Sequence, residues 1–186
     1  MITKRDREVI NFIKKFKVAT TSTIAELFYP SLRVAQRRLM TLVSHRELKR
    51  ERYYINQEYM YYIKKPKQLR HRLLLTDFYR EIHKLGFEIE YFDNEVIIDD
   101  IRPDGLLAYR YQNKAYIAFV EVEISNKGLN ISKYKKLLKT GKYKKYFPVF
   151  PIIIAITDHK IPIQQDLVII QVKEDLSNIK TCFRQL

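Results

Sequence analysis

Cysteine and glycine are both scarce in this sequence of 186 residues, which holds one cysteine and four glycines. The single cysteine, Cys182, excludes an internal disulfide bond and a zinc site built from cysteine thiolates. With so few glycines there is no glycine-rich loop of the kind that cradles nucleotide phosphates. The sequence therefore offers no support for a nucleotide-dependent activity.

Long hydrophobic runs are also missing. The longest apolar run, Val149 to Ile156, has the length of a strand and contains Pro151, whereas a membrane-spanning helix needs about 20 apolar residues. The first seven residues, MITKRDR, carry no apolar stretch of the kind that a secretory signal has. Since 46% of the residues are hydrophobic, the chain can still build a core. We therefore expect a folded cytoplasmic protein that makes no contact with a membrane.

Positive charge is abundant and unevenly distributed. The formal net charge is +14, and residues 1–65 alone carry 15 basic against 6 acidic side chains, a net of +9. Residues 66–186 carry 20 against 15, a net of +5. A concentrated positive field attracts polyanions, because each phosphate that is neutralised releases a counterion. The charge distribution indicates a nucleic acid as partner of the first third.

The first third has the pattern of short helices. Apolar residues at helical spacing predict a helix over residues 4–16. Thr23 and Glu26 have the spacing of a capping box and predict a second helix, which Pro30 ends. Ser31 is a suitable N-cap for a third helix. The buried face of this third helix is predicted to consist of Leu32, Ala35, Leu39 and Leu42.

Two alternating segments, Leu48–Tyr54 and Tyr59–Ile63, then predict a β-hairpin around residues 55–58. Three helices and a hairpin are the order of a winged helix-turn-helix, whose third helix lies in the major groove of DNA. The predicted DNA contacts are Arg33, Gln36, Arg37, Arg38 and Thr41 of that helix and Lys49, Arg50 and Arg52 of the wing. Two alternatives are a merely solvated basic face and a winged helix that binds only protein. We expect the hairpin tyrosines (Tyr53, Tyr54, Tyr59, Tyr61 and Tyr62) to pack against neighbouring side chains rather than to stack on bases.

The lysine-rich segment 64–67 is the expected joint between a first domain, 1–65, and a second, 66–186. In the second domain the pattern predicts an α/β or α+β fold with a mixed sheet flanked by helices. The predicted order is a helix, a three-stranded meander, a helix and two further strands: Leu69–Leu85, Phe87–Phe92, Leu106–Tyr111, Ala115–Ile124, Ser132–Tyr143, Val149–Thr157 and Leu167–Val172.

This order resembles the core of the PD-(D/E)XK nucleases, and the residues that carry the resemblance are Asp104, Glu121 and Glu123. In such nucleases carboxylates at the first two positions hold Mg²⁺, and a lysine two residues after the second carboxylate orients the attacking water. Here Glu123 occupies the lysine position, so the resemblance implies little or no cleavage. If the chain is a nuclease, Asp104 and Glu121 bind Mg²⁺ and all three carboxylates are catalytic. The water is then activated by the metal alone or by a lysine from elsewhere in the chain. If the chain is not a nuclease, no cofactor is expected. The candidate lysines are Lys127, Lys133 and Lys136.

The two halves together resemble the replication-relaxation family. The motifs that carry this resemblance are Thr20–Thr21, Ile24–Phe28, Arg37–Leu39, Leu69–Leu73, Arg102–Asp104, Phe119–Glu123 and Lys136–Leu137. The family commonly has Glu-x-Asp followed by Arg in the second strand, where this chain has Glu121-x-Glu123 and then residues 124–127, Ile-Ser-Asn-Lys. Members of the family are associated with plasmids and other mobile elements.

The resemblance implies a double-stranded DNA-binding protein of a mobile element, which acts in replication initiation, in relaxosome function and transfer, or in their regulation. A relaxase or a replication initiator is the expected protein partner, and a homodimer is compatible with the sequence. Two alternatives stay open at this stage. One is a metal-dependent endonuclease that uses Asp104, Glu121 and Glu123, and the other is a transcriptional repressor whose second domain dimerises.

Overall fold

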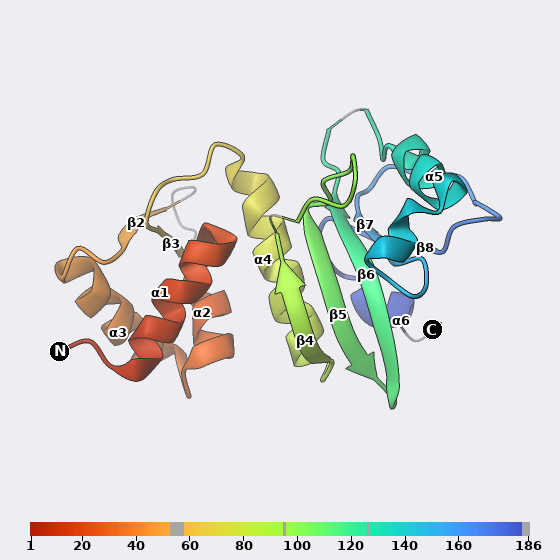
Figure 1. Cartoon of the computed structure of the whole chain (residues 1–186). Coiled ribbons are helices and arrows are strands. Elements are labelled where there is room, and N and C mark those ends of the chain that lie inside the picture. Colours follow the sequence, from red (N-terminus) through yellow and green to blue (C-terminus); the bar gives the residue numbers. More distant parts are fainter. Residues whose placement is uncertain (53–57, 95, 126, 184–186) are drawn as a thin grey trace. The chain divides into compact units, whose positions relative to one another are not determined.

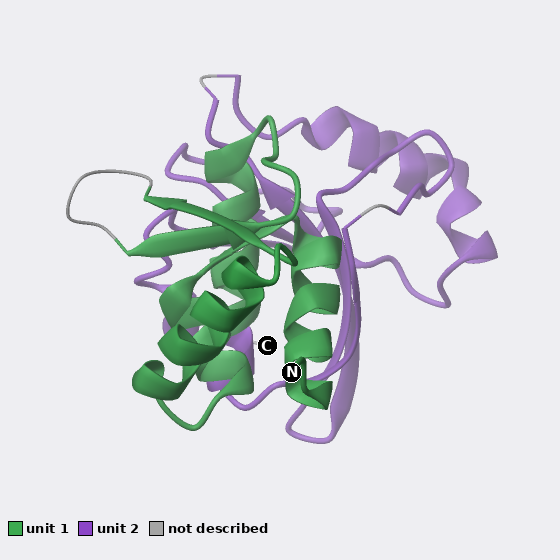
Figure 2. Ribbon diagram, turned by 90° about the vertical axis from the view of Figure 1, so that its left-hand side faces the viewer, with its two compact units in different colours: residues 1–80 green, residues 81–186 purple. Residues whose placement is uncertain are grey.

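The computed structural model describes residues 1–52, 58–94, 96–125 and 127–183. The chain forms two compact units, residues 1–80 and residues 81–186 (Figure 2). The boundary between these units lies inside a helix, α4 (Leu69–Lys84), whereas the pattern of the sequence places the joint at residues 65 and 66. None of the helices in the described ranges combines the length and the apolar character that a membrane-spanning segment needs.

Unit 1 consists of helices around a small antiparallel sheet in which β3 is the central strand. This sheet has the order β1-β3-β2, so the two predicted hairpin strands do pair with each other. The turn predicted at residues 55–58 falls largely outside the described residues. The elements of unit 1 in chain order are α1 (Lys4–Phe16), β1 (Val18–Thr20), α2 (Thr21–Phe28), α3 (Leu32–Ser44), β2 (Lys49–Arg52), β3 (Tyr59–Tyr62) and most of α4.

Side-chain caps define where the helices of unit 1 begin. Ser31 caps α3 as predicted, since its hydroxyl accepts a hydrogen bond from the Val34 amide. The predicted capping box at Thr23 is wrong. The N-cap of α2 is Thr20, whose hydroxyl accepts from the Thr23 amide at 3.3 Å. Because β1 ends at Thr20, the helix begins directly after the strand, and Thr23 lies buried in its first turn.

The core of unit 1 lies between α1, α2, α3 and the sheet. Ala35, Leu39 and Leu42 are fully buried, but Leu32 is 50% exposed. The prediction that Leu32 belongs to the buried face was wrong. Leu32 is the first residue of α3, and the buried residues of this helix begin at Ala35. The first part of α4 belongs to this unit. The Thr76 hydroxyl donates to the Val18 carbonyl at 2.9 Å. Tyr79 of α4 also packs in an aromatic cluster with Phe12, Phe16 and Phe28.

Unit 2 contains a five-stranded mixed sheet of order β4-β5-β6-β7-β8 (Figure 1). The first three strands are antiparallel neighbours, and β6, β7 and β8 run parallel to one another. The prediction of a mixed sheet flanked by helices is confirmed. The sequence pattern missed the short α6, and it predicted one helix over Ser132–Tyr143 where the structure has α5, ending at Thr140, and the separate η1. The elements are β4 (Glu88–Asp93), β5 (Gly105–Tyr111), β6 (Lys114–Val122), α5 (Ile131–Thr140), the 3₁₀ helix η1 (Lys142–Lys145), β7 (Ile152–Ile156), β8 (Ile169–Val172) and α6 (Ile179–Phe183).

The crossover from β6 through α5 to β7 brings α5 against the sheet, where Tyr134 and Leu137 pack beside Phe119 in one buried cluster. Gly105, at the start of β5, directly follows Asp104. A Cβ at this position would lie 2.9 Å from Cζ of Phe92, so a larger residue would displace that ring.

Candidate nucleic-acid interface and carboxylate site

Helix α3 presents a basic face to solvent. Arg33, Gln36 and Arg37 are exposed, and the helical period of about 100° per residue places them opposite the buried side of α3. The Thr41 side chain is half-buried, and its hydroxyl donates to the Arg37 carbonyl at 3.1 Å within the same helix. Of the predicted contacts on α3, the structure therefore brings three long polar side chains onto one exposed face. Met40, which the sequence pattern did not single out, is 46% exposed on the same helix.

Arg38 is oriented differently, because it forms an ion pair with Asp6 of α1. Its Nε lies 3.1 Å from one oxygen of Asp6, and an Nη2 proton is donated to the other. The fully buried Asp6 side chain also accepts from the Tyr29 hydroxyl at 2.9 Å and from the Thr3 amide at 2.7 Å. Burial by itself would raise the pKa of Asp6, but hydrogen bonds from Arg38, Thr3 and Tyr29 outweigh it and hold this pKa well below its usual range. Arg38 thus links α3 to α1.

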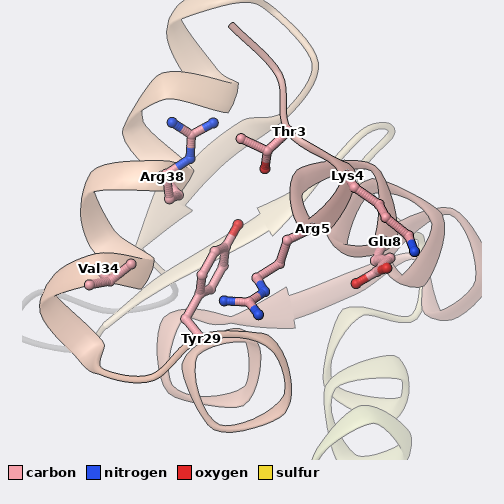
Figure 3. A pocket seen from close by; sticks show the side chains of 7 residues that line it. All are labelled: Thr3, Lys4, Arg5, Glu8, Tyr29, Val34 and Arg38. Atoms are coloured by element: carbon pink, nitrogen blue, oxygen red, sulfur yellow. The ribbon is translucent and has the colours of Figure 1, made fainter.

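A surface pocket of about 550 Å³ lies beside this network (Figure 3). Its lining includes three basic side chains and one acidic side chain. Figure 3 shows that residues of α1 and α3 contribute to it together with Tyr29, which follows α2. Lys4 and Arg5 thus place basic side chains of α1 beside Val34 and Arg38 of α3 at this pocket. The lining residues are Thr3, Lys4, Arg5, Glu8, Tyr29, Val34 and Arg38.

The predicted wing residues lie on β2. Lys49 and Arg52 are exposed, and Arg50 is half-buried. The guanidinium carbons of Arg50 and Arg52 lie 4.3 Å and 4.8 Å from the ring centroid of Tyr59 on β3. Arg50 also donates to the sulfur of Met40, which connects β2 to α3.

The tyrosines of the hairpin follow the packing prediction where the structure describes them. Tyr61 and Tyr62 are buried, with 2% and 8% of their surfaces exposed. The Tyr62 hydroxyl donates to Glu51 at 2.8 Å. Tyr53 and Tyr54 lie outside the described residues.

Unit 2 brings two of the three predicted carboxylates together. Asp104 precedes β5 and accepts a hydrogen bond from the Val122 amide of β6 at 2.8 Å. Glu121 of β6 is only 8% exposed, and Lys133 of α5 donates to it at 2.6 Å. The Tyr134 hydroxyl donates to the same Glu121 oxygen. Burial raises the pKa of Glu121, and the charge of Asp104 adds to this rise, while Lys133 opposes it.

Glu123 does not join this pair. Its carboxylate accepts from the Ser125 amide at 2.8 Å and from the Ser125 hydroxyl. Period-two alternation would place Glu121 and Glu123 on the same side of a strand, but β6 ends at Val122 and the Glu123 side chain turns to Ser125. Within the described ranges, no group of three or more His, Cys, Asp or Glu side chains is arranged to hold a metal ion.

Of the three candidate lysines, the structure brings Lys133 to the carboxylate pair. Lys136 forms an ion pair with Asp100 instead. The sequence predicted the helix that follows β6, but it did not predict how this helix is rotated about its own axis. This rotation decides which lysine faces Glu121. The two carboxylates match the ligands that Mg²⁺ takes from a protein when substrate phosphates complete its coordination.

Comparison with known proteins does not identify a relative. No family model matches the chain, and no curated protein or solved structure matches it. The function is therefore inferred from the residues and contacts described above.

Proposed function

We propose that the protein binds double-stranded DNA through unit 1, with α3 in the major groove and the β2–β3 hairpin against the backbone as a wing. The observation that carries the proposal is the exposed face of α3. Arg33 and Arg37 flank Gln36 there, and neither arginine forms a salt bridge with a carboxylate of the described residues. Arginine forms paired hydrogen bonds with guanine and glutamine with adenine in the major groove, so this face has the chemistry of direct base readout.

The contacts around α3 support the same proposal. Asp6 and Arg38 attach one side of the helix to α1, and the Met40–Arg50 contact attaches it to β2. A recognition helix that is held by its neighbours needs less ordering when it binds. In this arrangement Arg38 acts as a positioning residue, and Arg33, Gln36 and Arg37 are the proposed contacts to bases and phosphates.

The biological setting is proposed from the resemblance to the replication-relaxation family. On this basis the protein acts on DNA of a plasmid or another mobile element, in replication initiation, transfer or their regulation, and a relaxase or an initiator is the proposed partner. The motif residues Thr20 and Thr21 lie at the beginning of α2, and the motif Arg37–Leu39 lies in α3. Their place in the two helices supports this assignment.

The experiment that tests DNA binding is selection of duplexes from a random pool by the purified protein, followed by titration of the enriched sequence. We expect a shared sequence motif and an affinity for it at least 10³-fold above that for unrelated duplex, which is the lower end for specific DNA-binding proteins. Recovery of no motif, together with equal affinity for all duplexes at about 150 mM salt, close to physiological ionic strength, would contradict sequence-specific binding.

A second candidate function, a metal-dependent endonuclease, is favoured by the position of Lys133, whose ammonium group lies beside the Asp104–Glu121 pair, although its present hydrogen bond to Glu121 would have to give way to a metal ion. Lys133 supplies a positive charge beside the two carboxylates. Glu123, which occupies the position of the usual lysine, does not. Asp104 and Glu121 would hold a bound Mg²⁺, and this ion would supply charge neutralisation at the phosphoryl oxygens. The antiparallel β4–β5–β6 meander and the α5 crossover to β7 are consistent with a PD-(D/E)XK nuclease-like unit. Incubation of supercoiled and linear DNA with Mg²⁺ or Mn²⁺ tests this candidate.

A further inference from the structure

The guanidinium groups of Arg50 and Arg52 both lie over the aromatic ring of Tyr59. Arg52 is its partner in the register of β2 and β3, and Arg50 lies two residues earlier on the same face. With distances of 4.3 Å and 4.8 Å to the ring centroid, the two guanidinium carbons are no more than 9.1 Å apart. Two like charges repel each other, and an anion bound between them would offset this repulsion.

The nearby carboxylates do not supply that anion. Glu51, which lies between the two arginines in the sequence, binds Tyr62 and Lys65 on the other face of the hairpin. Glu58, beside Tyr59, accepts two hydrogen bonds of 2.7 Å from the amide and the hydroxyl of Ser22. Among the residues that the structure describes, no carboxylate forms a salt bridge with Arg50 or Arg52.

We propose that Arg50 and Arg52 form a binding site for phosphodiester groups of the duplex backbone, and that Tyr59 is the residue that positions both side chains. This inference rests on the proposed function of unit 1. The planar guanidinium is suited both to stacking on a ring and to paired hydrogen bonds with phosphate oxygens. Stacking restricts the rotamers of two long side chains before DNA arrives, so less conformational entropy is lost on binding.

The contacts around this site fix its place relative to α3. Arg50 donates to Met40 of α3, and Glu58 attaches the beginning of β3 to Ser22 of α2. A phosphate bound by the arginine pair is therefore held at a defined distance from the recognition face. Because two guanidinium groups lie over its ring, Tyr59 contacts these arginines rather than a base. The site therefore contributes affinity that is independent of DNA sequence.

The test compares Tyr59→Leu and Tyr59→Phe in titrations of a fluorescent duplex over a range of salt concentrations. Tyr59→Leu should weaken binding about three- to fivefold, which is the contribution of an exposed cation–π contact. The log–log dependence of affinity on salt should become shallower by about 0.9 for each phosphate contact that is lost. Tyr59→Phe keeps the ring and should behave like the wild type. Tyr91→Leu, which removes an exposed tyrosine from β4 of unit 2, is the matched control and should change neither quantity.

Two further variants separate a positioning role from a structural one. In the Arg50→Ala/Arg52→Ala background, Tyr59→Leu should have no further effect, because the residue acts through these arginines. Arg52→Ala removes one guanidinium of the pair, and it should give the shallower salt dependence even if Tyr59→Leu does not fold.

Each outcome decides between the inference and the proposed function. If the wild type binds duplex DNA but Tyr59→Leu and Arg52→Ala keep its salt dependence, the inference is overturned and the proposed function stands. The inference is likewise overturned if Tyr59→Leu weakens binding equally in the double-alanine background. A larger loss on single-stranded than on duplex DNA would assign Tyr59 to base stacking instead. If the wild type binds no duplex DNA, both proposals fail.

Discussion

Lys133 and Glu121 are joined by a 2.6 Å hydrogen bond between α5 and β6. The two residues are 12 positions apart, and the crossover that returns the chain to β7 brings the helix over the end of the strand. The lysine thus reaches the carboxylate from a neighbouring element, while Glu123 turns toward Ser125. Glu121 is nearly buried, so its charged form depends on Lys133 and on the Tyr134 hydroxyl.

We predict that the purified protein does not cleave DNA efficiently with Mg²⁺. Lys133 and Tyr134 both donate to one oxygen of Glu121, so a metal ion must compete with them for this carboxylate. The measurement is conversion of supercoiled plasmid to nicked and linear forms. Robust Mg²⁺-dependent cleavage that is abolished by Asp104→Ala would overturn this prediction and promote the endonuclease candidate. Glu123→Gln is the control, and it should leave any cleavage unchanged because Glu123 lies outside the pair.

The second prediction concerns base recognition by α3. Replacement of both Arg33 and Arg37 by alanine should remove at least ~2 kcal/mol of specific binding free energy, since each good base contact contributes about 1–3 kcal/mol. Affinity for unrelated duplex should fall less. Lys144→Ala/Lys145→Ala removes the same charge from η1 in unit 2 and serves as the matched control. Unchanged specific binding by the folded Arg33/Arg37 variant at equal salt would refute the assignment of α3.

The third prediction concerns the salt dependence of binding. If the basic side chains of unit 1 make about five phosphate contacts, the slope of log affinity against log salt should be roughly −4 to −5. The measurement is titration of one duplex at several salt concentrations between about 50 and 300 mM, the range in which such slopes are observed. A slope near zero would show that the positive charge of the first third serves another purpose.

The fourth prediction concerns the stability of unit 1 and its pH dependence. Asp6→Asn should lower the free energy of unfolding by about 2–3 kcal/mol at pH 7. This is less than the roughly 3–5 kcal/mol expected for a fully buried ion pair, because Arg38 is partly exposed. The folded-state pKa of Asp6 lies below its unfolded value of about 3.9. Its contribution is therefore complete above that value and is lost as the pH falls through the folded-state pKa.

Denaturant titrations of the wild type and Asp6→Asn between pH 7 and pH 2 measure this effect. The difference in unfolding free energy should be constant at neutral pH and should shrink below about pH 4. Glu8→Gln, which changes an exposed carboxylate of the same helix, is the control and should leave stability nearly unchanged. A difference between wild type and Asp6→Asn that does not vary with pH would show that the charge of Asp6 does not stabilise the fold.

Local pattern was sufficient to predict most elements. The helical spacing of apolar residues predicted α1 and α3, and alternation predicted β2, β3, β5 and β6 to within a few residues. Ser31 was predicted as the cap of α3 because a hydroxyl before a helix satisfies an amide of its own first turn. The exposure of Arg33, Gln36 and Arg37 could also be predicted locally, because it depends only on the period of the helix.

Contacts between distant residues were decided by the tertiary structure. The helical period turns Arg38 closer to the buried face than Arg37, but no local pattern predicts its partner Asp6, which is 32 residues away. The position of Lys133 beside Glu121 depends on how α5 is rotated on the sheet, and the place of α4 in unit 1 depends on packing against β1 and α1. A sequence pattern determines which side of an element is apolar. Which charged groups meet depends on how the packed elements are oriented, and the apolar pattern of each element does not specify this orientation.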